Sequence, residues 1–322
     1  MSGRLIEWLR IGRIHTAPAS IILLVSSFTI GGGSFFSLMG VILLLYGVLL
    51  HWSTFGHNVV MDYYWDLDDP GKKHHPLVSG RLKLNESVNT VLPILGITLL
   101  LGLSFAFGNN VALFWFALYM VGGFLYNNWL SKTTVFGFIP ITLCFTSLSL
   151  YAMSLAGGVN VLYALYIMFT IWYQIGWSGY LKEIEVEYQA NMLRRLGVRV
   201  VDSVLKIPTK AKIYGLTLKL GNLVTAYFLL IDIAKFENIT TIIVSSVLVG
   251  LIVSNLLKTL KTRGWNRDYE LKNMSLMEIY TIYLGMFLAM PLLEALTLAV
   301  FGVAWFSIMN RLLWGTRLTP KV

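Results

Sequence analysis

Long apolar stretches alternate with shorter polar segments along most of the chain. About 20 residues of helix cross the hydrocarbon core of a bilayer, whereas the strands of a membrane barrel are shorter and alternate apolar with polar residues. The pattern therefore predicts membrane-spanning helices over ten segments: Ala17–Gly31, Phe36–Phe55, Val88–Phe107, Val111–Leu130, Val135–Leu155, Val161–Leu181, Ile213–Ile231, Thr240–Leu257, Leu276–Met290 and Leu292–Leu313.

The number of spans depends on the last apolar region, Leu276–Leu313. This region is too long for one ordinary membrane helix, and it contains Pro291, which interrupts helical hydrogen bonding. It predicts either two spans or a single broken one. We therefore expect nine to ten transmembrane helices.

Composition supports the same class of protein. Of the 322 residues, 56% are hydrophobic and 13% are charged, whereas soluble globular domains contain roughly a quarter charged residues. No linker or low-complexity tract divides the chain, so we expect a single polytopic, all-α membrane domain over residues 1–322. The lone Cys144 excludes a disulfide framework within the chain.

The net charge of +9 is explained by membrane topology and does not indicate nucleic-acid binding. Membrane proteins concentrate Lys and Arg in cytoplasmic loops. Met1–Thr16 has no cleavage-site pattern and predicts a short interfacial helix that is retained. With the N-terminus inside, alternate loops face the cytoplasm and carry the basic residues, whereas the opposite loops carry almost none except Lys235. The basic residues of the cytoplasmic loops are Lys72, Lys73, Arg81 and Lys83; Lys132; Lys182 through Lys212; Lys258 through Lys272; and Arg311, Arg317 and Lys321.

One polar segment, residues 58–81, carries candidate chemistry. Asn58, Asp62 and Asp66 recur at intervals of four, so a helix through them places all three side chains on one face. A few carboxylates with open coordination are typical of Mg²⁺ sites that also bind a phosphate group. A solvated helix end is the alternative. The following loop adds groups that suit phosphate charge: Lys72, Lys73, His74, His75 and Arg81.

A second acidic segment, residues 182–189, follows the predicted span Val161–Leu181. Glu183 and Glu187 are four residues apart, so on a helix they share one face, and Glu185 lies between them. Two acidic helix ends that face each other can hold Mg²⁺ and a diphosphate from both sides. The alternative is a solvated charged loop.

The first segment resembles the aspartate-rich motif of the UbiA superfamily of intramembrane prenyltransferases. That motif reads N-x-x-x-D-x-x-x-D and is followed by a loop of the type R-P-x-x-S-G-R. This chain has His75 where the first arginine of the loop usually stands. The matching residues are Asn58, Asp62, Asp66, Pro76, Ser79, Gly80 and Arg81.

The second segment resembles the second motif of the family, K-D-x-x-D-x-x-x-D, in a modified form. Lys182 and Glu183 match its first two positions, but the acidic residues here are glutamates and the register is open. The resemblance therefore implies that Glu183, Glu185 and Glu187 share the role of metal ligand in this segment.

The family resemblance implies a helical bundle around a central cavity that both motifs cap on the cytoplasmic side. It implies Mg²⁺ ligated by Asn58, Asp62 and Asp66, which we also expect to be the catalytic residues, together with the three glutamates. Five further residues are expected to bind the diphosphate: Lys132, Lys182, Arg81, His75 and Arg13.

The implied function is Mg²⁺-dependent transfer of an isoprenyl group from a prenyl diphosphate to a lipophilic acceptor within the lipid bilayer. A quinone precursor or a glycerol-phosphate lipid is the expected acceptor. Two alternatives remain open. One is a terpene cyclase of the same superfamily, and the other is a non-catalytic protein that binds or transports lipid.

Overall fold

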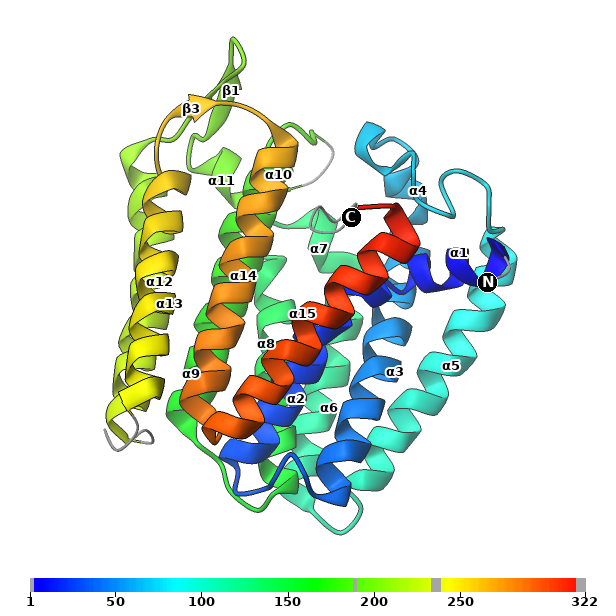
Figure 1. The fold of residues 1–322 in the computed structure, drawn as a ribbon. Coiled ribbons are helices and arrows are strands. Elements are labelled where there is room, and N and C mark those ends of the chain that lie inside the picture. The colour runs from blue at the N-terminus through cyan, green and yellow to red at the C-terminus, as the bar shows by residue number, and fades with distance from the viewer. Residues whose placement is uncertain (1–2, 188–189, 233–238, 317–322) are drawn as a thin grey trace.

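The computed structural model describes residues 3–187, 190–232 and 239–316, and most of them are helical (Figure 1). Each predicted apolar segment contains one long helix. These helices are α2 (Ala17–Ile30), α3 (Leu38–Met61), α5 (Leu84–Phe105), α6 (Asn110–Leu125), α8 (Phe138–Leu155), α9 (Val161–Tyr173), α12 (Thr209–Asp232), α13 (Ile239–Thr259), α14 (Arg267–Ala289) and α15 (Leu292–Trp314).

Among the described residues, seven helices are long and apolar enough to cross a membrane. An eighth span results if α1 (Gly3–Ile11) and the following helix through Ile30 are counted together, although they are bent by 56°. Helix α9 is only 13 residues long by itself, and α14 begins with charged residues. The seven apolar helices make the protein an integral membrane protein. Because α9 and α14 do not qualify as spans by themselves, the count of nine to ten spans stays a prediction.

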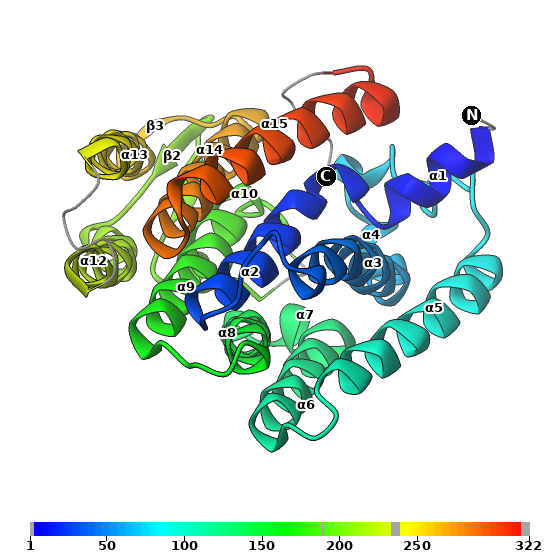
Figure 2. The ribbon, with the colours of Figure 1, turned by 60° about the horizontal axis from the view of Figure 1, so that its bottom comes forward.

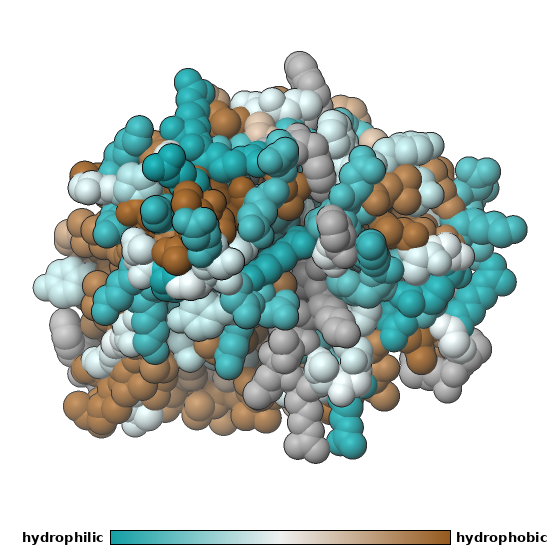
Figure 3. Space-filling view, turned by 90° about the horizontal axis from the view of Figure 1, so that it is seen from above, coloured by the Kyte–Doolittle hydropathy of each residue, from teal (hydrophilic) through white to brown (hydrophobic). Residues whose placement is uncertain are grey.

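The short polar elements gather at one end of the bundle, which we call the polar end (Figure 1). They include α4 (Tyr63–Asp66), α7 (Ser131–Thr133), α10 (Tyr180–Lys182) and α11 (Met192–Arg195). A view onto this end shows hydrophilic side chains spread across it, with apolar side chains between them and along part of the margin (Figure 3). Both predicted acidic segments therefore lie at the same end of the molecule.

A small sheet at the polar end departs from the all-α expectation. Strands β1 (Arg199–Val201) and β2 (Val204–Lys206) pair antiparallel, and β2 also pairs with β3 (Arg263–Gly264). The two turn residues, Asp202 and Ser203, both have positive φ, as a tight hairpin requires. These strands are short and lie within loops, so their pattern is hidden among polar residues.

The long helices surround α2, which contacts α3, α8, α14 and α15 (Figure 2). Other close pairs are α6 with α8, α9 with α12, and α13 with α14. Lipid tails are as apolar as leucine side chains, so association of membrane helices relies on close packing and on small residues at the contact. Gly122 provides such a contact between α6 and α8.

We expect Gly122→Ala to destabilise the bundle. A Cβ atom at this position would lie 2.7 Å from the carbonyl oxygen of Pro140 and 2.9 Å from the backbone nitrogen of Cys144. Because backbone atoms cannot rotate away, the helices must separate, at a cost of about 1–3 kcal/mol. Thermal unfolding in detergent measures this loss. Gly96→Ala on α5 is the control, since its Cβ meets no atom within 4 Å; equal melting temperatures for the two variants would contradict the prediction.

Candidate diphosphate site

The first acidic segment is nearly continuous with helix α3. The N–H of Asp62 donates to the carbonyl of Asn58, and the N–H of Asp66 donates to the carbonyl of Asp62, both at 2.9 Å. Helical hydrogen bonding therefore continues into α4, and the three side chains share one face, as the spacing predicts. Asp62 and Asp66 are buried, whereas the neighbouring Asp68 is exposed.

Asn58 and Asp62 are fixed by residues from the segment that follows α6. The side-chain amide of Asn58 donates to Asp62 Oδ2 at 3.3 Å and to Asn127 Oδ1 at 3.1 Å. Asn127 Nδ2 also lies 3.0 Å from His57 Nδ1. Lys132 Nζ lies 3.5 Å from Asp62 Oδ2. The sequence pattern does not single out Asn127; its only signal is its position near the end of an apolar stretch, shortly before Lys132.

Burial and neighbouring charges both shift the pKa of Asp62. Removal from water raises the pKa of Asp62, and the nearby charges of Lys132, Lys72 and Arg13 act in the opposite direction. Asp66 adds a like charge that raises the pKa of Asp62 further. An additional cation beside this pair would therefore favour the ionised form.

The second acidic segment differs from the helix that its spacing suggests. Helix α10 ends at Lys182, and the chain then turns. Asn191 Nδ2 donates to the carbonyl of Tyr180 at 2.8 Å and thereby ties the returning loop to the end of α10. Glu183 and Glu187 therefore do not share a helical face.

The turn separates the three glutamates. Glu183 is only 15% exposed at its side chain, and its Oε1 lies 3.4 Å from Lys182 Nζ. Glu185 is exposed and accepts a hydrogen bond from Trp265 Nε1 at 2.5 Å. Glu187 is also exposed. Of the glutamates expected to share one role, Glu183 alone lies among buried cations.

Lysines connect the two acidic segments. Burial alone would raise the pKa of Glu183, but the charges of Lys182, Lys132 and Lys72 outweigh that effect and lower it to about 2. Lys132 also acts on Asp62. Two lysines therefore interact with acidic groups from both segments, which brings those segments together in one site.

Lys72 lies within this site, although the sequence presents it only as one of several loop cations. Its side chain is buried, at 7% exposure. Burial and the charge of Arg13 lower the pKa of Lys72 to about 8, while the carboxylates of Asp66 and Glu183 act in the opposite direction. The structure thus adds Lys72 to the set of candidate diphosphate ligands.

Two π-helical turns set the positions of the other lysines. Tyr126–Leu130 precedes the turn that carries Lys132, and Gln174–Gly179 precedes the turn that carries Lys182. A π-helical turn widens the helix and rotates every residue that follows it. The directions of both lysines therefore depend on a feature that the sequence pattern does not reveal.

The remaining predicted basic groups differ in their surroundings. Arg13 has a left-handed φ of 46° where the chain bends between α1 and α2, and its charge acts on Asp62 and Lys72. His75 is buried, and burial together with the charge of Lys72 lowers its pKa well below the ordinary value. His75 is therefore neutral at physiological pH and suits a hydrogen-bonding role rather than a cationic one.

Arg81 is directed toward α1. Its Nε donates to Glu7 Oε2 at 3.0 Å, and its Nη2 donates to the carbonyl of His74. Its side chain is 41% exposed. The expected direct role of Arg81 in diphosphate binding is therefore not supported by a contact with the acidic pair among the described residues.

A bidentate ion pair fixes the loop that follows α4. Arg267 Nη1 and Nη2 donate to Asp69 Oδ1 and Oδ2, both at 3.1 Å, and the N–H of Gly71 donates to Asp69 Oδ1 at 2.8 Å. This arrangement joins the loop to the first turn of α14. The loop that carries Lys72 is thereby held against a second element of the bundle.

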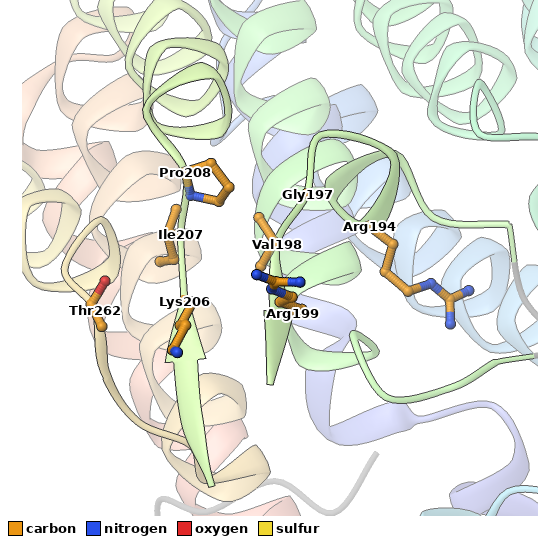
Figure 4. Close-up of a pocket in the computed structure, with 8 residues that line it drawn as sticks. All are labelled: Arg194, Gly197, Val198, Arg199, Lys206, Ile207, Pro208 and Thr262. Atoms are coloured by element: carbon orange, nitrogen blue, oxygen red, sulfur yellow. The ribbon is translucent and has the colours of Figure 1, made fainter. Parts of the chain in front are cut away.

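A separate cleft of about 680 Å³ opens at the polar end (Figure 4). None of the residues predicted to bind diphosphate or metal lines this cleft. The side chain of Arg194 extends away from the other lining residues. The lining residues are Arg194, Gly197, Val198, Arg199, Lys206, Ile207, Pro208 and Thr262.

The protein is a polytopic helical bundle in which two acidic segments and the lysines between them lie together at one end. The model of the UbiA prenyltransferase family matches residues 19–279. The chain therefore belongs to the UbiA prenyltransferase family. No curated protein matches it.

Solved structures of UbiA homologues share this fold. A digeranylgeranylglyceryl phosphate synthase is 17% identical, with a TM-score of 0.58 over 88% of this chain and 98% of that one. The Archaeoglobus fulgidus homologue bound to GPP and Mg²⁺ is 15% identical, with a TM-score of 0.57 over 88% and 99%. The apo homologue from Aeropyrum pernix K1 is 15% identical, with a TM-score of 0.63 over 85% and 97%.

Proposed function

We propose that this protein transfers an isoprenyl group from a prenyl diphosphate to a lipophilic acceptor, with Mg²⁺ as cofactor. The observation that carries the proposal is the connection of Asp62, Asp66 and Glu183 through shared buried lysines. Four cations, Lys72, Lys132, Lys182 and Arg13, face these three carboxylates, which leaves a positive charge for an anion to balance. A diphosphate that enters with a divalent cation provides that balance.

The donor set suits Mg²⁺ without forming a complete metal cage. Across the described part of the chain, no three His, Cys, Asp or Glu side chains are gathered closely enough to hold a metal by themselves. Mg²⁺ is usually bound by one or two carboxylates, several waters and the phosphates of the substrate. We infer that Asp62, Asp66 and Asn58 hold Mg²⁺ from one side and Glu183 from the other.

The chain's own cations would bind the diphosphate and stabilise its departure. Lys72, Lys132, Lys182 and Arg13 surround the acidic groups, and buried cations act more strongly on a developing charge than cations in water. As the C–O bond of the allylic diphosphate breaks, negative charge accumulates on the leaving group and is met by these side chains. Bound Mg²⁺ would neutralise part of the same charge.

The position of the site favours lipophilic substrates. The acidic segments directly follow helices that cross or enter the apolar region, so an isoprenoid tail can remain in hydrocarbon while its diphosphate reaches the polar end. The structural likeness to a digeranylgeranylglyceryl phosphate synthase supports a glycerol-phosphate lipid as one acceptor class, and a quinone precursor is the other. We place the polar end and the N-terminus in the cytoplasm, because basic residues concentrate there.

Release of pyrophosphate by the purified protein in nanodiscs tests this function. Prenyl diphosphates of several chain lengths, geranylgeranyl diphosphate among them, are supplied in turn with Mg²⁺. Each is tested with and without a panel of quinone precursors and glycerol-phosphate lipids, and products are identified by mass spectrometry. Acceptor-dependent release supports prenyl transfer. Release with a cyclised product and no acceptor would show a cyclase, and no release with any prenyl donor would refute an enzymatic function.

The pH dependence of donor binding tests Lys72. Because its pKa is lowered to about 8, Lys72 loses its proton as the pH rises through that value, and the site then loses one positive charge. We expect kcat/KM for the donor to fall above pH about 8, since this parameter follows the titration of the free enzyme. In Lys72→Arg the fall should disappear, because arginine stays protonated. A decline that is identical in both proteins would exclude Lys72 as its cause.

A further inference from the structure

Helices α1 and α15 meet beside the loop that follows α4, and both lie outside the family-matched residues 19–279. In two views α15 runs diagonally across the bundle and ends near α1 (Figures 1 and 2). Contacts of α15 with α1 and with the turn Ile14–Thr16 confirm that approach. The last turn of α15 thus lies against α1 at the polar end.

Arg10 holds the last turn of α15. Its Nε donates to the carbonyl of Leu313 at 2.9 Å, and its Nη2 donates to the same oxygen. The guanidinium carbon also lies 4.7 Å from the ring centre of Trp314. Earlier in α15, Trp305 Nε1 donates to the carbonyl of Ile14 at 2.7 Å. The helix end is therefore fixed by hydrogen bonds and by a cation–π contact.

Glu7 connects this contact to the loop. Its Oε1 accepts from Arg10 Nη1 at 2.5 Å, and its Oε2 accepts from Arg81 Nε at 3.0 Å. The residue is 9% exposed, so both charge-assisted hydrogen bonds form in a mostly dry environment. The Glu7 carboxylate thereby links Arg10, which is hydrogen-bonded to α15, with Arg81 of the loop.

Trp314 contacts the same loop at its other end. The ring of His74 meets the Trp314 ring edge-on at 5.5 Å and 80°, and His15 meets it at 6.1 Å and 84°. Arg81 Nη2 donates to the carbonyl of His74. Segment 74–81 is thus held at both ends, and the buried His75 lies inside it.

We propose that α15 is a positioning element for the diphosphate site: through Arg10, Glu7 and Trp314 it holds segment 74–81, and with it Lys72 and His75, beside the acidic pair. This role rests on the proposed function. It gives Arg81 an indirect part, because Arg81 acts through Glu7 and does not touch the substrate. An ordered loop binds its ligand more tightly, since the entropy of ordering is not lost on binding.

Limited trypsin digestion and steady-state kinetics test the proposal on the full-length protein in nanodiscs. Lys72, Lys73 and Arg81 are tryptic sites, so cleavage there reports on the loop without reference to activity. We expect Arg10→Ala and Trp314→Ala to accelerate this cleavage about tenfold and to raise KM for geranylgeranyl diphosphate about tenfold, with kcat changed less than about twofold.

Two variants serve as controls. Arg4→Ala removes another arginine of α1, whose ion pair leads to Glu86 on α5 and not to α15, so cleavage and KM should stay at the wild-type level. Trp314→Phe keeps an aromatic ring against His74 and should retain most of the wild-type behaviour.

The outcomes separate the positioning role from the proposed function. Wild-type cleavage and KM in both alanine variants would overturn the proposal, as would equal effects in Arg4→Ala or a fall in kcat alone. If no protein shows turnover, wild type included, but the two alanine variants are cleaved faster than wild type, the positioning role of α15 is supported and the prenyltransferase function is refuted.

Discussion

Asp62→Asn is expected to lower pyrophosphate release by about 100-fold or more, the largest effect of any single substitution considered for this protein. Asparagine preserves the shape of the side chain and removes its charge. Asp62 is buried, lies 3.5 Å from Lys132 and accepts a hydrogen bond from Asn58. Without the carboxylate, the proposed Mg²⁺ site would lose a ligand, and Lys132 would lose its acidic partner. Pyrophosphate release at saturating donor, and at a Mg²⁺ concentration just sufficient to saturate the wild type, measures the loss.

Asp68→Asn is the matched control, because Asp68 lies in the same segment but is exposed. Its activity should stay within about twofold of wild type, as is usual for surface changes away from a site. Partial recovery of Asp62→Asn at high Mg²⁺ concentration would show that metal affinity is the quantity lost. Similar activities for Asp62→Asn and Asp68→Asn would place the metal elsewhere.

The sequence predicted the positions of the long helices because hydrophobic length is a strong signal in membrane proteins. Each apolar segment contains a long helix, and even the division at Pro291 is present, since α14 ends at Ala289 and α15 begins at Leu292. The hairpin of β1 and β2 was not predicted. Its three-residue strands offer too few positions for an alternating pattern to stand out from a polar loop.

The first acidic segment was predictable for a related reason. The four-residue spacing of Asn58, Asp62 and Asp66 determines a shared face wherever helical hydrogen bonding persists, and it does persist through Asp66. The same reasoning was wrong for Glu183 and Glu187. Spacing defines a face only within a helix, and here Asn191 binds the carbonyl of Tyr180 and fixes the turn after Lys182.

The roles of individual cations depend on tertiary contacts and were not accessible from spacing. Lys72 and Arg81 both belong to the loop after α4, yet Lys72 is buried near Asp66 whereas Arg81 reaches Glu7 on α1. Arg81 has the stronger sequence signal, because it matches the family motif. The partner that redirects it, Glu7, lies 74 residues earlier in the chain.

Glu183→Gln should lower activity by roughly 10- to 100-fold, a loss that is typical when a residue supporting a metal site is removed. The lysines of the site hold the pKa of Glu183 down at about 2, so it is ionised in the folded protein at any working pH. Glutamine would leave Lys182, Lys132 and Lys72 with one fewer counter-charge, so their mutual repulsion would increase. Mg²⁺ would also lose its ligand from the second segment.

The free energy of unfolding should also depend on the charge of Glu183, and therefore on pH. Its folded pKa, about 2, is below the ordinary value of 4.5, so its contribution to the free energy of unfolding is present above pH about 4.5 and is lost as the pH falls toward 2.

For the loss of activity, Glu187→Gln is the matched control, because Glu187 is four residues away and exposed. Activity lost in Glu183→Gln and kept in Glu187→Gln would establish a site with acidic groups on two sides. Equal retention would reduce the metal site to Asn58, Asp62 and Asp66 alone.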